Sequence, residues 1–219
     1  MSKARSRETK PDGHPTTIER WNALWKREGA NVGLADVYGS LIDSYSEKNR
    51  AYHNLSHISD CLKEFDQAKQ LLKNKDDVEV AIWFHDIIYD TKRGDNEERS
   101  AEFAYKVAKS VGLSEGSAKR IHDYILATKH KGTPRDNDAK FVMDIDLSSL
   151  GASQETFETN SSNIRKEYSW VSEHEFKIER TNFLNYFLNR PGIYMTSFFR
   201  KKYEEIAKEN IKSYLAKLK

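Results

Sequence analysis

Apolar side chains recur every three or four residues along most of this chain, which is the spacing of one face of an α-helix. Such stretches begin at Thr17 and continue, with short breaks, almost to the last residue. The alternation of apolar and polar residues that is typical of strands is almost absent, and the chain has only 4 prolines. The pattern therefore predicts an all-α fold of about eight or nine helices, with ligand-bearing helices at the centre and additional C-terminal helices packed around them.

Polar residues that precede the apolar stretches predict where individual helices begin. Asn54, either Asp76 or Asp77, then Asp95 and Ser114 each stand at the start of one stretch. Gly112 and the Pro191-Gly192 pair are typical of positions where a helix ends. The remaining expected elements are a loop at residues 131–138, a helix from Ser153 to Val171, a helix from Ser172 to Leu188 and a last helix after Gly192.

Length and composition limit the classes of protein to consider. A chain of 219 residues suffices for one domain, expected at residues 16–219 after a disordered polar tail at residues 1–15. The net charge of +2 gives no electrostatic argument for a nucleic-acid polymer or a membrane as the partner. No apolar run approaches the roughly 18–20 residues that span a bilayer, and the first residues lack the apolar core of a secretory signal. We therefore expect a soluble cytoplasmic protein.

The single cysteine, Cys61, excludes an intrachain disulfide and a zinc site built from thiolates. We interpret it as a small buried hydrophobic residue.

Histidine and aspartate gather at a few positions that suit a divalent metal. His57, the adjacent pair His85-Asp86 and the doublet Asp144/Asp146 provide imidazole and carboxylate groups, which bind the metals of hydrolytic sites. An adjacent histidine and aspartate inside an apolar run cost free energy unless both groups have partners. Metal ligation would satisfy both of them. Residues two apart on a helix point about 200° away from each other, so only one of Asp144 and Asp146 is expected to face a metal.

His53 precedes His57 by four residues, the spacing of the zinc-protease helix that reads His-Glu-x-x-His. Asn54 stands where such a protease needs its general base, so this interpretation fails. Because His53 lies at or before the predicted helix cap, we expect it to line a pocket rather than to bind the metal.

The order of these residues resembles the HD superfamily of metal-dependent phosphohydrolases, and in particular a family of predicted HD phosphohydrolases. The resemblance covers roughly residues 18–215. It implies metal ligands at His57, His85, Asp86 and Asp146, with Asp144 as the alternative to the last. It is carried by six blocks in the same order: Tyr52-His53-x-x-x-His57-Ile58, Phe84-His85-Asp86-x-x-Tyr89-Asp90, Asn96-Glu97-x-x-Ser100-Ala101, Thr128-x-His130, Asp144-x-Asp146-Leu147-x-x-Leu150-Gly151 and Ile164-Arg165-x-Glu167-Tyr168.

The expected activity is hydrolysis of a phosphate ester by metal-activated water, with a small phosphorylated metabolite or a nucleotide as the substrate. The metal is one of Mn, Fe, Co, Ni, Zn or Mg, among which the sequence does not choose. Asp86, Asp90 and Glu97 are the expected catalytic residues, the last two as proton-transfer groups. The alternative role for the polar residues of the loop after Asp86 is to cap the helix that follows it. His53, His130 and Arg165 are the expected contacts to substrate.

Two other functions remain open at this point. The first is a di-iron oxygenase on the same fold, for which His53 and His130 are the evident extra ligands. The second is a module that binds a nucleotide without turning it over. A homodimer is also left open.

Overall fold

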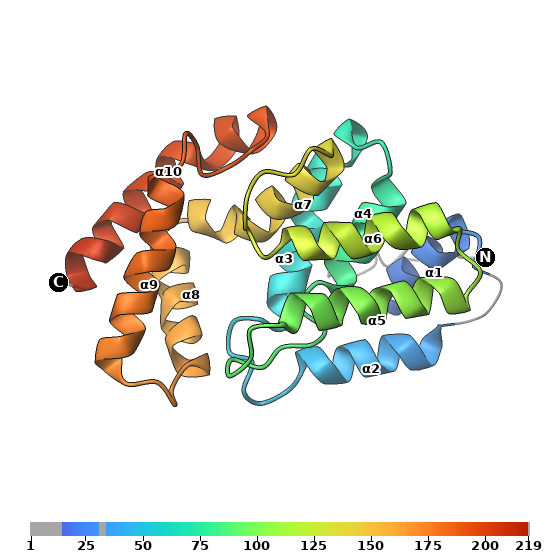
Figure 1. Ribbon diagram of the computed structural model, residues 1–219, viewed down its shortest axis with the longest axis horizontal. Helices are drawn as coiled ribbons and strands as arrows, with labels where there is room; N and C mark the ends of the chain where they lie inside the picture. The colour runs from blue at the N-terminus through green and yellow to red at the C-terminus, as the bar shows by residue number, and fades with distance from the viewer. Residues whose placement is uncertain (1–14, 31–33, 219) are drawn as a thin grey trace, which may run out of the picture.

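The computed structural model describes residues 15–30 and 34–218, and these residues form ten α-helices, two short 3₁₀ helices and no strand (Figure 1). The all-α prediction is confirmed. The tail predicted at residues 1–15 lies, apart from Pro15, outside the described residues. The helices are α1 (Ile18–Arg27), α2 (Ala35–Tyr45), α3 (Leu55–Ala68), η1 (Lys69–Leu71), α4 (Lys75–Phe84), α5 (Asn96–Ser110), α6 (Glu115–Ala127), α7 (Asn137–Asp146), η2 (Leu147–Gly151), α8 (Gln154–Glu167), α9 (Glu173–Leu188) and α10 (Ser197–Leu218).

The expected number of helices was slightly too small. Helix α7 is short and most of its residues are buried, among them Phe141, Val142 and Ile145. Two other buried residues of α7 are the aspartates Asp138 and Asp144, which interrupt the apolar spacing from which the helices were counted. The helix expected to run from Ser153 to Val171 is also shorter, because α8 ends at Glu167.

The predicted caps were right where a side chain reaches the first turn. Asn54 accepts a hydrogen bond from the backbone of Ser56 at 2.8 Å, and Ser114 accepts one from Ser117 at 3.1 Å. Each bond satisfies a backbone N–H group that the helix itself leaves without a partner. Local sequence therefore determines where α3 and α6 begin.

The cap predicted at Asp76 or Asp77 was wrong, and Asp95 stands at its predicted cap position without making a capping bond. Helix α4 already begins at Lys75, and the buried Asp77 carboxylate instead accepts hydrogen bonds from the side chains of Ser117 and Arg120 on α6. Asp95 occupies the cap position of α5, but its carboxylate pairs with Arg93 at 2.6 Å and makes no capping bond. In both cases a charged partner outside the helix takes the carboxylate.

Helix α4 is the centre of the larger group of helices. It packs against α1, α3, α5, α6 and α7, and all of its residues from Asp77 to Phe84 are buried. Trp83 packs edge-on against Trp21 of α1 with ring centroids 5.5 Å apart, and its neighbour Phe84 also contacts Trp21. The carboxyl end of α4, where the His-Asp pair follows, is thereby held in a rigid core.

The helices after Gly151 lie beside this core, not around it as expected (Figure 1). Helix α10 packs mainly on η2, where a Cβ atom on Gly151 would lie 2.5 Å from the Cβ of Tyr203. The side-chain amide of Asn210 donates to the carbonyl oxygens of Leu150 and Ala152 at 2.9 Å. This attachment at one end leaves room for a pocket between α8–α9 and the core. Among the described helices, none combines the length and the apolar character needed to cross a membrane.

Candidate metal centre and pocket

Three elements bring the predicted metal ligands together. His57 lies in the first turn of α3, Asp146 is the last residue of α7, and His85 and Asp86 follow the end of α4. The sequence argument placed His85 and Asp86 on the helix itself, but α4 ends at Phe84 and the pair forms a turn. The turn leaves both side chains free to point to the same side.

The nitrogen and oxygen atoms of these four side chains face one point. His57 Nε2 lies 3.2 Å from His85 Nε2 and 3.1 Å from Asp146 Oδ1. Asp86 Oδ2 lies 3.2 Å from His85 Nε2 and 3.7 Å from His57 Nε2, and Asp146 Oδ1 lies 3.5 Å from His85 Nε2. Two ligand atoms that are each about 2.1 Å from one ion lie about 3.0–3.4 Å apart. The spacing of the four groups therefore fits a shared metal ion.

The protonation of His85 also fits such an ion. Its Nδ1 lies 2.9 Å from the carbonyl oxygen of Ile82, which can only accept a hydrogen bond, so Nδ1 carries a proton. In the neutral imidazole this leaves the lone pair on Nε2, the atom that faces His57 and the carboxylates. Two neutral imidazoles and two carboxylates have a formal charge of −2, which a divalent cation balances.

The pKa values of His85, Asp146 and Asp86 indicate a negative electrostatic potential at the point that the four side chains face. Burial alone would lower the pKa of His85, but the charge of Asp86 and the hydrogen bonds that His85 donates to both carboxylates hold it well above its ordinary value. Burial would raise the pKa of Asp146, yet contacts with His130, His57 and His85 hold it well below its usual range. In Asp86, too, burial is outweighed by the charge of His85, and its pKa is lowered. A field that retains a proton on a buried imidazole also favours a cation.

Asp144 has a different role from Asp146. It is fully buried and accepts hydrogen bonds at 2.7 Å from the backbone N–H groups of Met195 and Thr196. Its carboxylate thus fixes the segment before α10, on the side of α7 away from the histidines. Helical geometry predicted this division, with one carboxylate facing the metal position and the other turned away from it.

Cys61 lies closer to the metal position than the sequence indicated. His57, Cys61, His85 and Asp146 form a group whose ligand atoms all lie within 4.8 Å of one another, and Cys61 Sγ is 3.7 Å from His57 Nε2. Burial, and next the charges of Asp146 and Asp86, raise the pKa of its thiol well above its ordinary value. A zinc site built only from thiolates remains excluded. The structure nevertheless has a buried group that could hold a metal ion, formed by His57, Cys61, His85 and Asp146.

Arg50, which the motifs did not single out, supports the ligand-bearing turn. Its side chain is 1% exposed, and its guanidinium donates to the carbonyl oxygens of Asp86 at 2.5 Å and of Ile87 at 2.9 Å. It also lies over the ring of Tyr89, 5.5 Å from the centroid. Sequence offers one signal, namely that an arginine stands two residues before the Tyr52-His53 motif. The two carbonyl partners in the ligand-bearing turn, Asp86 and Ile87, lie more than thirty residues away from Arg50.

Glu167, at the end of α8, stands in the last of the six motif blocks but was given no role from sequence. Its carboxylate accepts hydrogen bonds from the backbone N–H groups of Tyr52 and His53 at 2.7 and 2.9 Å, and from Tyr89 Oη at 3.0 Å. It also lies 2.7 Å from His53 Nδ1. Burial opposes it, but the hydrogen bond from His53 and that histidine's charge keep the pKa of Glu167 below its ordinary value. Glu167 thus joins the C-terminal helices to the His53 loop.

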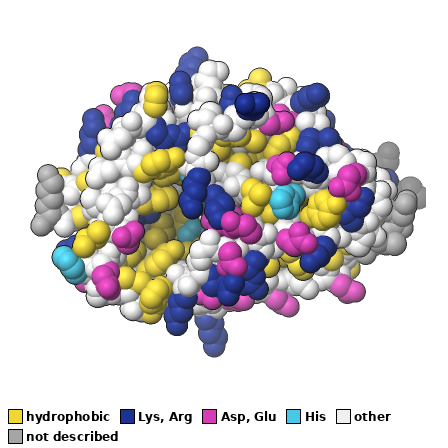
Figure 2. Space-filling view, viewed as in Figure 1, with side chains coloured by type: hydrophobic (Ala, Val, Ile, Leu, Met, Phe, Trp, Pro, Cys, Tyr) yellow, Lys and Arg dark blue, Asp and Glu magenta, His cyan; other side chains and the backbone are white. Residues whose placement is uncertain are grey.

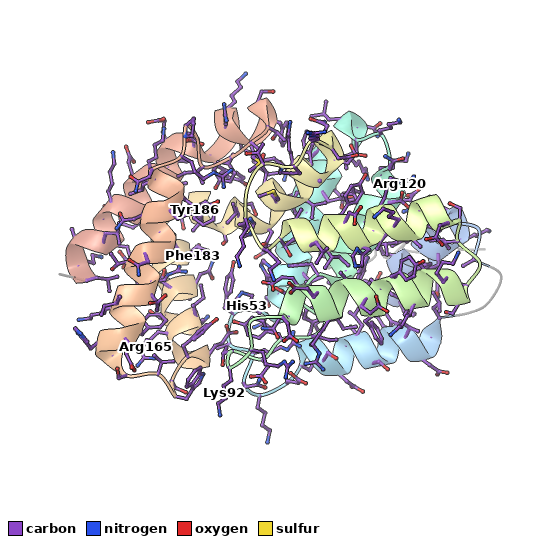
Figure 3. The ribbon with its side chains drawn as sticks, in the orientation of Figure 1. His53, Lys92, Arg120, Arg165, Phe183 and Tyr186 are labelled. Carbon is purple, nitrogen blue, oxygen red and sulfur yellow. The ribbon has the colours of Figure 1, made fainter. Side chains whose placement is uncertain are left out.

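Two of the four predicted ligands, Asp86 and Asp146, line a cavity of about 870 Å³ between α8–α9 and the core. Figure 2 shows a hollow lined by hydrophobic side chains on this face of the molecule. In Figure 3 His53 lies on the core side of the opening, and Phe183 projects from α9 on the opposite side. Asp86, Asp146 and His53 all line the cavity. The volume is in the range of pockets that hold small organic ligands.

The other predicted site residues are distributed unevenly around this pocket. His130 lines it and lies 2.8 Å from Asp146 Oδ2, while its Nδ1 is buried with no hydrogen-bond partner in the described part of the chain. Glu97 lines it as well, 4.0 Å from Lys129 Nζ. Asp90 is not among the lining residues, because its carboxylate accepts from the backbone of Lys92 and stabilises the loop.

Arg165 also lies outside the pocket lining. Its guanidinium donates to the carbonyl oxygens of Tyr168 at 2.6 Å and Val171 at 3.0 Å, and it pairs with Glu173. It also lies over the ring of Phe176, 4.8 Å from the centroid. These contacts stabilise the turn between α8 and α9. Arg165 therefore has a structural role in this arrangement, not the substrate contact expected from sequence.

Comparison of the chain with protein-family models, with curated proteins and with solved structures finds no match. The resemblance to the HD superfamily rests on the sequence motifs.

Proposed function

We propose that this protein is a metal-dependent phosphohydrolase of the HD type, which cleaves a phosphate ester with a water activated at the His57, His85, Asp86 and Asp146 site. The observation that supports this most is the convergence of two imidazole nitrogens and two carboxylates, both of which line a pocket. Mixed nitrogen and oxygen ligation suits the divalent metals of hydrolytic sites. Such an ion lowers the pKa of a bound water from 15.7 towards about 7 and stabilises charge on phosphoryl oxygens.

The side chains of the pocket would perform the remaining tasks. His130 orients Asp146 by holding its second carboxylate oxygen, which leaves Oδ1 facing the histidines. His53 donates through Nδ1 to Glu167, so its Nε2 is the atom available to a phosphate oxygen in the pocket. Glu97 is the proton-transfer group of choice, because it lines the pocket and Asp90 does not.

The test is to strip the purified protein of metal and reload it separately with Mn, Fe, Co, Ni, Zn or Mg. Metal content and phosphate release from a panel of phosphomonoesters and nucleotides are then measured. We expect about one equivalent of metal and metal-dependent phosphate release. Asp86→Asn should lose both. Glu97→Gln should retain the metal and lose turnover, typically about 10²–10⁴-fold for a proton-transfer group.

Asp90→Asn is the matched control, because it changes a carboxylate of the same loop outside the pocket lining. It should affect stability more than turnover. Phosphate release that persists in the metal-free protein, or an Asp86→Asn variant with unchanged metal content, would contradict the proposal.

A further inference from the structure

The wall of the pocket opposite the metal position is apolar and partly unoccupied. It is built by α8, α9 and the turn between them, and its lining includes Phe157, Phe176 and Phe183. Trp170 and Phe183 remain 53% and 41% exposed, although each belongs to the lining. Exposed aromatic side chains that line a pocket are typical of surfaces that contact an apolar part of a ligand.

Arg180 lies within this apolar wall. It lines the pocket, and its guanidinium lies over the ring of Phe183, 5.3 Å from the centroid. Its Nε is buried and has no hydrogen-bond partner in the residues that the structure describes. Its electrostatic neighbours include the phenol groups of Tyr214, Tyr52 and Tyr168, and Tyr214 also shares a hydrogen bond with its side chain. A guanidinium shielded from water needs an anion or several acceptors to offset its lost hydration.

Two other cations of the pocket, Arg93 and Lys129, already have such partners, and a third, Lys131, lies in the loop after α6 and not in this wall. Arg93 pairs with Asp95 at 2.6 Å, and Lys129 pairs with Glu98. Glu175 and Glu179 also line the wall, but in the described part of the chain neither of them forms an ion pair with Arg180. Arg180 is therefore the cation of this wall that remains available to a ligand.

We propose that the pocket binds an organic phosphate with two anionic ends, whose large apolar or aromatic middle packs on Phe176 and Phe183 and whose second anionic group pairs with Arg180. The first anionic end is the phosphate at the metal position, so this inference rests on the proposed function. The four metal-ligand candidates belong to α3, α7 and the turn after α4, whereas Arg180 belongs to α9, so the two anionic groups would be held by separate elements of the pocket. Compact phosphorylated metabolites would leave the aromatic wall uncovered.

The experiment uses two phosphonates that resist hydrolysis, a biphenyl methylphosphonate and the same molecule with a carboxylate at the far end. Their dissociation constants are measured by calorimetry with manganese-loaded protein and again in the presence of a chelator. Wild-type protein should bind the carboxylated probe about 10- to 100-fold more tightly than the probe without a carboxylate, because one hydrogen-bonded ion pair with Arg180 contributes a difference of this size. Arg180→Gln should abolish this preference and Arg180→Lys should retain part of it. Arg93→Gln, which changes a lining arginine that already has a carboxylate partner, should leave it unchanged.

Equal binding of both probes by wild-type protein would overturn the proposal. So would an Arg180→Gln variant that weakens both probes equally, because Arg180 would then contact the phosphate itself or support the fold. The two proposals fail separately. Affinity that does not depend on manganese contradicts the metal site, whereas the preference for the carboxylated probe reports Arg180 alone.

Discussion

The carboxylate of Glu167 lies 2.7 Å from Nδ1 of His53, across 114 positions of sequence. This contact joins the end of α8 to the loop before α3, and so connects the C-terminal helices to the metal-ligand candidates. Burial alone would lower the pKa of His53, but the hydrogen bond to Glu167 raises it above its ordinary value. One ion pair therefore influences both the shape of the pocket and the charge of its most central imidazole.

Glu167→Gln should lower the pKa of His53, because a neutral amide stabilises the imidazolium less than a carboxylate does. We expect a stability loss of about 1–3 kcal/mol as well, since buried donors lose a charged acceptor. Histidine side-chain NMR measures the first effect and denaturant unfolding the second. An unchanged His53 titration would show that Glu167 acts only as a structural contact.

Asp146→Asn and Asp144→Asn should separate metal binding from stability. Asp146 faces both histidines, so its amide variant should lose bound metal and nearly all turnover. Asp144 accepts from two backbone N–H groups, so its amide variant should keep the metal and lose about 1–3 kcal/mol of stability. Metal analysis and thermal unfolding distinguish the two. If Asp144→Asn lost the metal instead, the last ligand would be misplaced by two residues.

Cobalt substitution should show whether Cys61 binds the metal. We expect no sulfur-to-cobalt charge-transfer absorption in the wild-type protein, and Cys61→Ala should retain the metal. Asp86 provides a carboxylate oxygen, already anionic, that lies 3.2 Å from His85 Nε2. The Cys61 thiol must first lose its proton, and burial and the charges of two carboxylates raise its pKa. A charge-transfer band that disappears in Cys61→Ala would instead identify a thiolate ligand.

Glu28 should make stability depend on pH. Burial, and then the charges of Asp77 and Asp76, raise its pKa from 4.5 to about 7. The folded protein thus binds a proton more tightly at Glu28 than the unfolded chain, so this residue lowers stability as pH rises from about 4.5 to 7. Glu28→Gln should therefore stabilise the protein at pH 8 and have little effect at pH 4. Melting temperatures of both proteins across this range give the measurement, and a difference that is constant with pH would contradict it.

Much of the helical framework can be predicted from sequence because its causes are local. Asn54 and Ser114 cap α3 and α6 through bonds to residues two or three positions away, and apolar spacing of 3.6 residues marks the buried faces. That only one of Asp144 and Asp146 faces the histidines follows in the same way, from the rotation between residues two apart on a helix, whereas the choice of Asp146 rested on the family resemblance. The start of α4 was predicted less well, because the Asp77 carboxylate binds Ser117 and Arg120 on α6 and does not cap its own helix.

The composition of the pocket was decided by tertiary structure alone. Arg165 and Arg180 lie on neighbouring helices, and nothing in the sequence distinguishes the two arginines. In the structure, Arg165 donates to carbonyl oxygens of its own turn, whereas Arg180 lines the cavity. Glu167 reaches His53 across 114 positions of sequence, and α10, which packs closely on η2 at Gly151, also contacts α8. Sequence by itself determined which residues form helices and which histidines and aspartates suit a metal. The orientation of the C-terminal helices, and with it the ligand that the pocket can hold, depends on contacts between residues far apart in the chain, which no local pattern records.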